Sequence, residues 1–362
     1  MATTLGRAAS PFMTTKASLR LPSLLDKDGR ISYPSAMTTV RNQHDLGSNI
    51  ASKEERFPRF HRRKGLPPLT RGITLALLFC VSPFAIVAQN PTHRDGVAVG
   101  AQYDSTHVYV APGDLDTFVN SFVATFGGQA SKRSVTNVLP VPSSTEFQYV
   151  WTSMGTLSVF AYQTPVPFPF GQERTGYLVT DMDQAIHDAR SAGAEVIVDP
   201  FKDPIGMDAV IQWPGGLKMQ LYWHSTPPQY APLATIPENR VYLSSDRADE
   251  FVKDFVSFAH GQIVADDKHA DAAEIACPGE IYRRILLRSL FGNMQVLVTN
   301  GHLPYPFGHE ITGYEVNNIT ATLAKAKQAN AKILWGPHTA KDRTTAILEF
   351  PGGYIAELHS PK

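Results

Sequence analysis

The chain contains an internal repeat. The segment PFPFGQERTGY at residues 167–177 returns as PYPFGHEITGY at residues 304–314, an offset of 137 residues. The triplet PGG at 214–216 recurs at the same offset, at 351–353, and similar segments further upstream are 133 residues apart. Because an internal repeat constrains the fold of the whole chain, we expect tandem copies of one structural unit.

Two homologous modules therefore form the body of the chain, at residues 101–223 and 240–360. The segment 224–239 between them is rich in proline and suits a stiff linker. A length of 362 residues, with 43% hydrophobic and 18% charged residues, is that of a folded protein with sizeable cores. The formal net charge is zero and no basic stripe is interleaved with aromatic residues, so we do not expect nucleic acid as a partner.

The N-terminal part of the chain differs from the two modules. Residues 1–72 are rich in Ser, Thr, Arg and Lys without periodicity, as in a disordered or targeting segment. The apolar run 73–88 has the length of a signal-peptide core and is short for a membrane span. We therefore expect export, to the periplasm or as a secreted protein. The alternatives are an organelle-targeting peptide, and a membrane anchor if the apolar segment stays uncleaved, in which case the membrane is a partner.

Each module is predicted to contain the order strand, helix and three strands twice. In module 1 a strand at 106–110 precedes a helix that starts after the capping residue Asp114 and ends at Gly127. The further expected elements are strands at 147–152, 156–162, 175–180, 217–223, 240–243, 285–290, 294–299, 312–316 and 354–358, and helices at 181–192, 248–259 and 318–329. This layout predicts an α+β fold of paired βαβββ units, in which helices cover one face of a curled mixed sheet.

Three features of the sequence resemble the vicinal oxygen chelate superfamily, which includes glyoxalase I, extradiol dioxygenases and bleomycin-resistance proteins. They are the order of elements with His107 at a strand start, the segment GYLVTD at 176–181 entering a helix, and PGGYIAEL at 351–358. The resemblance covers roughly residues 101–360. It implies tandem glyoxalase-like modules whose sheets form cups, with a divalent ion at the base of the cup in metal-dependent members.

The family's three metal-ligand positions map onto each module. In this chain they are occupied by His107, Arg174 and Gln220 in module 1, and by Arg240, Ile311 and Glu357 in module 2. Arginine has no acceptor atom and isoleucine no polar atom, so neither ligates an ion. Because a divalent ion in such enzymes needs at least three protein donors and an open position, we favour no metal cofactor.

Alternatives remain at these positions. A divalent metal is possible in module 1 if a β-bulge lets Glu173 join His107 and Gln220, although strand alternation otherwise directs Glu173 to the other face. In module 2, Arg240 and Glu357 are expected to form an ion pair in place of the metal. The alternative is that Arg240 anchors the carboxylate or phosphate of a substrate.

The face of module 1 that forms the cup carries polar side chains. His107 alternates in phase with Tyr109, and Gln220 with Tyr222, so these residues are expected to line the cup together with Trp151. Such a lining suits a small polar or aromatic ligand, and the alternative is a hydrogen-bonded cluster without a ligand. The further candidate ligand-binding residues are Arg174, Arg240 and Glu357.

The predicted function is binding of a small molecule in the module 1 cup. The protein would act as a binding protein or as a metal-free isomerase or lyase, and the scaffold alone does not decide whether it is catalytic. One alternative is a metal-dependent enzyme of the glyoxalase or dioxygenase type. The other is a non-catalytic interaction protein.

Overall fold

The computed structural model describes residues 96–362, apart from 138–140, 172–173 and 227. The predicted targeting segment and signal-peptide core lie outside the described residues. Within the described part, no helix is long and apolar enough to cross a membrane.

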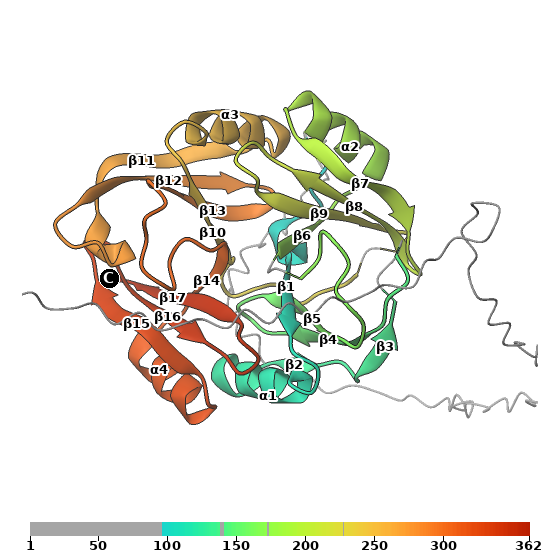
Figure 1. The fold of residues 1–362 in the computed structure, drawn as a ribbon, viewed down its shortest axis with the longest axis horizontal. Helices are drawn as coiled ribbons and strands as arrows, with labels where there is room; N and C mark the ends of the chain where they lie inside the picture. Colours follow the sequence, from blue (N-terminus) through green and yellow to red (C-terminus); the bar gives the residue numbers. More distant parts are fainter. Residues whose placement is uncertain (1–95, 138–140, 172–173, 227) are drawn as a thin grey trace, which may run out of the picture. The chain divides into compact units, whose positions relative to one another are not determined.

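Module 1 is built on one mixed sheet, which has nine strands within the described residues. The strand order is β2-β4-β5-β1-β6-β9-β8-β7, and β3 pairs with β4 (Figure 1). The elements are a short 3-10 helix (Ala101–Tyr103), β1 (Ser105–Val110), α1 (Leu115–Phe126), β2 (Gln129–Ala130), β3 (Ser134–Thr136), β4 (Thr145–Trp151), β5 (Thr156–Tyr162), β6 (Arg174–Leu178), α2 (Met182–Ser191), β7 (Glu195–Lys202), β8 (Gly206–Gln212) and β9 (Lys218–His224).

Module 2 repeats this arrangement in a second sheet. Its strand order is β11-β12-β13-β10-β14-β17-β16-β15. The elements are β10 (Glu238–Leu243), α3 (Ala248–Phe258), β11 (Gln262–Asp271), a 3-10 helix η2 (Ala272–Ile275), β12 (Ile281–Ser289), β13 (Gly292–Val298), β14 (Ile311–Glu315), α4 (Ile319–Gln328), β15 (Lys332–Thr339), β16 (Arg343–Glu349) and β17 (Ile355–Pro361). The predicted α+β fold of two tandem glyoxalase-like modules with curled mixed sheets is confirmed.

The centre of each sheet brings the mapped ligand positions together. β1 runs parallel to β5 and antiparallel to β6, and β6 runs parallel to β9. In this register His107 faces Arg174, and in module 2 Arg240 faces Ile311. The last strand of each module, β9 or β17, lies beside β6 or β14 and carries the third position.

The helix ends follow the predicted chemistry in part. The side chains of Asp181 and Asn318 accept hydrogen bonds from the backbone N–H groups of Gln184 and Ala321, which caps α2 and α4. Asp114 precedes α1 as predicted, but its side chain makes no capping hydrogen bond and its backbone is already helical. The predicted capping role of Asp114 is therefore wrong.

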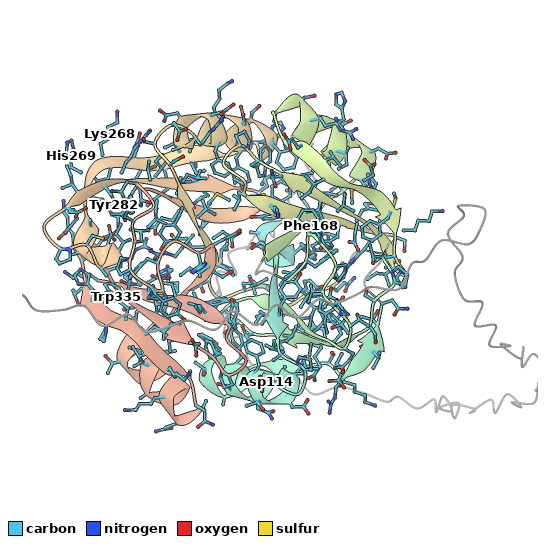
Figure 2. The ribbon with its side chains drawn as sticks, in the orientation of Figure 1. Asp114, Phe168, Lys268, His269, Tyr282 and Trp335 are labelled. Carbon is cyan, nitrogen blue, oxygen red and sulfur yellow. The ribbon has the colours of Figure 1, made fainter. Side chains whose placement is uncertain are left out.

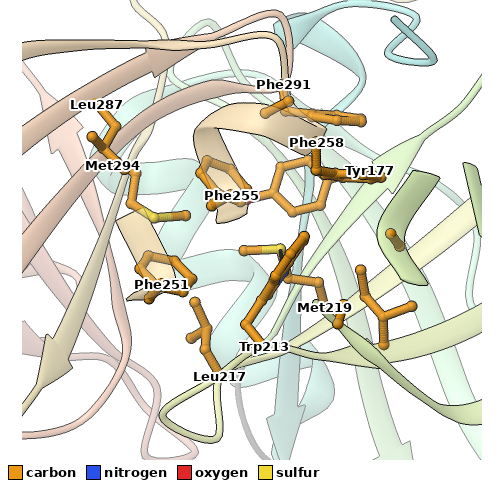
Figure 3. Packing of buried hydrophobic residues seen from close by; sticks show 14 of the residues in the cluster. Tyr177, Trp213, Leu217, Met219, Phe251, Phe255, Phe258, Leu287, Phe291 and Met294 are labelled. Carbon is orange, nitrogen blue, oxygen red and sulfur yellow. Dashed lines mark hydrogen bonds between the residues drawn. The ribbon is translucent and has the colours of Figure 1, made fainter. Parts of the chain in front are cut away.

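The helices pack across the module boundary. In one core, Trp213, directly after β8, contacts α3 of module 2, with its ring centroid 5.8 Å from that of Phe255 and 5.3 Å from that of Phe258 (Figure 3). In the other core, Phe350 of module 2 packs on Phe122 of α1, with centroids 5.3 Å apart. Helices α1 and α4 accordingly lie side by side (Figure 1). The two modules thus share two hydrophobic cores, in addition to their covalent linker.

Candidate functional site

The open face of the module 1 sheet encloses a cavity of about 320 Å³. Cavities of this size accommodate small molecules. Aromatic rings form much of its wall: Phe147, Tyr149, Phe160, Phe170, Phe201, Tyr222 and Tyr230. Its polar lining residues are Ser105, His107, Ser134, Thr136, Asn137, Ser158, Asp203, Asp208, Gln220 and His224. The wall therefore combines aromatic surface with a comparable number of hydrogen-bonding and charged side chains.

His107 lies in the wall of the cavity and is almost fully buried. Its ring meets that of Phe160 edge to face, with centroids 5.6 Å apart. Gly176 on β6 provides the space for it, because a Cβ atom there would lie 3.0 Å from His107 Nε2 and 3.1 Å from Tyr222 Cε1. A glycine at this position thus lets both side chains occupy the middle of the sheet.

Burial keeps the phenol groups of Tyr222 and Tyr230 and the imidazole of His224 uncharged at neutral pH. Tyr222 donates a hydrogen bond to the carbonyl of Tyr103, and burial raises the pKa of Tyr222 well above its usual range. Burial likewise raises the pKa of Tyr230 to about 12. Burial lowers the pKa of His224, against the opposing effect of the Asp203 carboxylate. His224 is therefore available as a neutral hydrogen-bonding or proton-accepting group.

The predicted cup residues divide into two groups. His107, Gln220 and Tyr222 line the cavity together. Tyr109 and Trp151 lie on the same face of the sheet but outside the cavity lining: Tyr109 stacks on Phe160 and Trp151 stacks on Tyr149. These two residues support the rings that line the cavity.

Arg174 lies on β6 opposite His107. The Arg174 side chain and Glu173 lie outside the described residues. Arg240 and Glu357 belong to module 2 and take no part in the module 1 cavity.

Several lining residues were not predicted as site residues. Tyr149 and Phe160 alternate with buried core residues on β4 and β5, so strand periodicity could have placed them on the face of the cup. Asp208 follows the same rule on β8. Tyr230 comes from the proline-rich linker, where no periodicity exists to predict its direction.

A buried apolar cluster covers part of the corresponding face of module 2. Ile311, at the position of Arg174, is buried, and Tyr282 and Trp335 approach from β12 and β15 of the sheet (Figure 2). Helix η2 is held there because Glu274 accepts hydrogen bonds from Tyr282 Oη and Arg284 Nη1, both at 2.8 Å. The buried residues of this cluster are Ala270, Ala272, Ile275, Tyr282, Leu297, Phe307, Ile311 and Ile347.

A buried ion pair occupies the mapped metal position of module 2, as predicted. Arg240 Nη1 lies 2.8 Å from Glu357 Oε1, and the two side chains are only 4% and 1% exposed. Glu357 Oε2 lies 2.8 Å from His359 Nδ1. Burial raises the pKa of Glu357, but Arg240 and then His359 lower it, and the net pKa lies below the ordinary value. Glu357 is therefore ionised, and each of its two carboxylate oxygens lies 2.8 Å from a nitrogen atom of a basic side chain.

Neither module offers a complete set of metal ligands among the described residues. In module 2 the carboxylate of Glu357 is held by a guanidinium group, and Ile311 supplies no donor. In module 1, His107 and Gln220 are two donors, fewer than a divalent ion requires. No group of three His, Cys, Asp or Glu side chains suited to a metal occurs within the part of the chain that is described. A metal in module 1 would therefore depend on Glu173.

The charge cluster of module 2 predicts a pH-dependent stability. Burial and the charge of Arg343 lower the pKa of His359, whereas Glu357 and Glu238 raise it, and the net pKa lies above the ordinary 6.5. The carboxylate of Glu315 also lies 3.9 Å from His359 Nε2. Protonated His359 therefore contributes stability that is fully present below the unfolded-state pKa and is lost as the pH rises through the folded-state pKa.

We expect the free energy of unfolding of the wild type, relative to His359→Gln, to fall as the pH rises from about 6 to about 9. Urea unfolding of both proteins at several pH values measures this difference. A difference that stays constant, or that grows with pH, would contradict the assignment.

Comparisons with known proteins identify the fold. No family model and no curated protein matches the sequence. Among solved structures, a mutant of 4-hydroxymandelate synthase from Streptomyces coelicolor aligns with a TM-score of 0.52 at 12% identity, over 74% of this chain and 93% of that chain. A Mn(II)-bound glyoxalase from Novosphingobium aromaticivorans aligns with a TM-score of 0.43 at 16% identity, over 73% of this chain and 82% of that chain.

The similarity to the 4-hydroxymandelate synthase mutant defines the class of fold. The chain shares with that protein a fold of two tandem modules, as the order of its elements predicted. At such low identity the similarity concerns the fold alone, so the chemistry has to be argued from the cavity.

Proposed function

We propose that the protein binds a small molecule in the cup of module 1. The observation that carries this proposal is the difference between the two cups. In module 1 the mapped positions His107 and Gln220 line a cavity of about 320 Å³. In module 2 a buried apolar cluster and the Arg240–Glu357 pair occupy the corresponding positions, and the cavity of about 270 Å³ found there lies at η2, β12 and the segment after β13, without Arg240, Ile311 or Glu357 in its lining. Side chains can thus occupy the centre of a cup in this fold. Because the centre of the module 1 cup stays open, we assign the ligand to it.

The lining of the cup supports either binding alone or metal-free catalysis. His107 and His224 both lie in the wall of the cavity, and the His224 ring centroid is 5.2 Å from that of Tyr222. Imidazole is the side chain most often used for proton transfer near neutral pH. Gln220 can donate and accept hydrogen bonds to orient a substrate. A proton-transfer reaction of the isomerase or lyase type would use these groups.

A variant that blocks the cavity tests the proposal. Thr136 lines the cavity from β3, and we expect Thr136→Trp to weaken ligand binding at least about tenfold, because the indole ring would take up ligand volume. The matched control is Thr339→Trp, on an exposed position of β15 in module 2. The ligand is first identified by native mass spectrometry of protein from its own source, and its affinity is then measured by calorimetry.

The two variants separate a site in module 1 from binding elsewhere. Equal affinity in Thr136→Trp and wild type would place the ligand outside this cavity. A second measurement uses protein stability. A ligand that binds only the native state, at a free concentration of 100 times its Kd, should raise the free energy of unfolding by about 2.7 kcal/mol.

A metal-dependent enzyme is the second candidate function. It is favoured by the presence of two metal-capable side chains, His107 and Gln220, on the cavity wall. Elemental analysis of the purified protein, with His107→Ala for comparison, tests it. A stoichiometric divalent ion that is lost in the variant would favour this candidate over the metal-free one.

We also propose that the protein is exported. The support is the apolar run 73–88, which follows a cluster of basic residues in the sequence and has the length of a signal-peptide core. The mass of the mature chain purified from its source tests this proposal. A mature protein that retains residues 73–88 would contradict cleavage there.

A further inference from the structure

Two polar atoms at the centre of the module 2 cup are buried without a protein partner. Among the described residues, neither Arg240 Nε nor Gln295 Oε1 has a hydrogen-bond partner. The two residues are only 4% and 1% exposed. A buried polar atom that forms no hydrogen bond loses its hydration without compensation, so native proteins rarely leave one unpaired. Both atoms therefore indicate a bound species that supplies the missing hydrogen bonds.

The two atoms belong to adjacent strands of one sheet. Arg240 on β10 lies opposite Gln295 on β13 in their parallel register, so both side chains are on the same face. Tyr242 is two residues further along β10, also on this face, and its Oη is a third buried polar atom. Burial raises the pKa of Tyr242 and the charge of Arg240 lowers it, which places the two groups close together.

The ion pair leaves Arg240 Nε without a partner. Glu357 Oε1 lies 2.8 Å from Nη1 of Arg240, so the carboxylate uses the far end of the guanidinium group. Gly313 on β14 makes room for the pair, because a Cβ atom there would lie 2.6 Å from Glu357 Oε2 and 3.5 Å from Arg240 Cδ. The two charged side chains thus meet over β14, and the N–H group at Nε remains available as a donor.

Water is the species whose chemistry fits these groups. Arg240 Nε is a donor and Gln295 Oε1 an acceptor, and water both accepts and donates hydrogen bonds. Water also serves either orientation of the Gln295 amide group. The Arg240–Glu357 pair is neutral as a whole, so it favours neither a cation nor an anion. An apolar molecule would leave both atoms unpaired.

The apolar cluster of module 2 encloses this position. Leu297 and Ile311 are buried members of the cluster, and Tyr242 packs against it. In the strand register Leu297 lies opposite Tyr242, and Ile311 lies opposite Arg240. Because these side chains separate the polar atoms from bulk solvent, water bound there should exchange slowly.

We propose that ordered water occupies the centre of the module 2 cup, at the mapped metal position of this module, and hydrogen-bonds to Arg240 Nε and Gln295 Oε1. The site is separate from the module 1 cavity and does not depend on the ligand proposed there. Its role is to complete the hydrogen bonding of the buried ion pair, since a pair of buried charges is stable only when its remaining polar atoms are satisfied.

Proton NMR spectroscopy tests the site in solution. The full purified chain carries isotope-labelled arginine, and the Hε signal of Arg240 is assigned by its absence from Arg240→Lys. We expect a cross-peak between this proton and water, with opposite signs in nuclear and rotating-frame Overhauser spectra, because the bound water stays longer than the tumbling time of the protein. A cross-peak to a protein side chain in place of water would overturn the proposal.

The control for this spectrum is Tyr242→Phe. The phenol proton of Tyr242 exchanges with water and could relay the signal to Arg240. A cross-peak that persists in Tyr242→Phe supports bound water, and one that disappears would overturn the assignment.

A crystal structure provides a second test, which applies even if Arg240→Lys does not fold. We expect a density peak for water within about 3.2 Å of Arg240 Nε, and no anomalous peak at this position in crystals soaked in bromide. A bromide ion there, or no density beside Arg240 Nε and Gln295 Oε1, would overturn the proposal.

Replacement of Gln295 by methionine tests the second partner. Gln295→Met removes the amide group at similar side-chain volume, and we expect it to lower the Tm by about 1–3 °C and to weaken the water cross-peak of Arg240. The matched control is Gln262→Met, at an exposed position of β11 in the same sheet, which should change the Tm by less than about 0.5 °C. An unchanged cross-peak in Gln295→Met, with equal Tm changes in both variants, would overturn the role of Gln295. If Gln295→Met does not fold, the wild-type spectrum and the crystal structure decide the question.

Discussion

Replacement of Arg240 by methionine is expected to destabilise the protein by about 3–5 kcal/mol, because it leaves the ionised Glu357 buried without its partner. The two side chains are almost fully buried and are joined at 2.8 Å, so water cannot replace the guanidinium group. Chemical denaturation of the two proteins at neutral pH measures the loss of unfolding free energy.

The double variant Arg240→Met/Glu357→Gln provides the control. Removing both charges together should recover most of the lost stability, since a buried ion pair contributes much less than the cost of breaking it. If Arg240→Met costs no more than the surface pair variant Arg247→Met, the buried pair does not have the assigned role; Arg247 is bonded to Glu250 in the exposed pair. Exposed pairs are worth about 0–1 kcal/mol.

Replacement of Trp213 by alanine is expected to cost roughly 3–5 kcal/mol, because it opens a void in a core that both modules share. The Trp213 ring is buried, its Nε1 lies 3.0 Å from Met219 Sδ, and it contacts the phenyl rings of α3. Thermal and urea unfolding of the variant measure this cost.

A second prediction concerns the number of unfolding transitions. Because Trp213 of module 1 packs on a helix of module 2, the two modules should unfold together in one transition. The control Ile281→Ala removes an apolar side chain that is 64% exposed and should change stability by less than about 0.5 kcal/mol. Two separate transitions, of which Trp213→Ala affects one, would contradict the shared core.

Much of the fold could be predicted from the sequence because each repeat carries the same apolar pattern. The stripe from Leu115 to Phe126 identified α1, and its counterpart identified α3. The edge strands were harder to place. Along β11 nearly every side chain is exposed, and β7 and β15 are interrupted by irregular register, so the alternation that identifies a strand is lost.

The candidate site could be predicted only where a residue type restricted the chemistry. Arg240 and Ile311 supply no atom that ligates a metal, and the predicted ion pair of Arg240 with Glu357 is confirmed. The filling of the module 2 cup was not predicted, since it depends on how η2 and Trp335 fold over the sheet. The position that such a segment takes over a sheet leaves no periodic pattern in the sequence.

The packing of helices across the module boundary suggests how the two modules came to be joined. A single module of this type would leave its helices uncovered and would need a second copy, so two identical chains would form a twofold symmetric dimer with two identical cups. Joining both copies in one polypeptide removes that symmetry requirement. One copy can then become a rigid scaffold while the other evolves toward a new ligand without loss of the common framework.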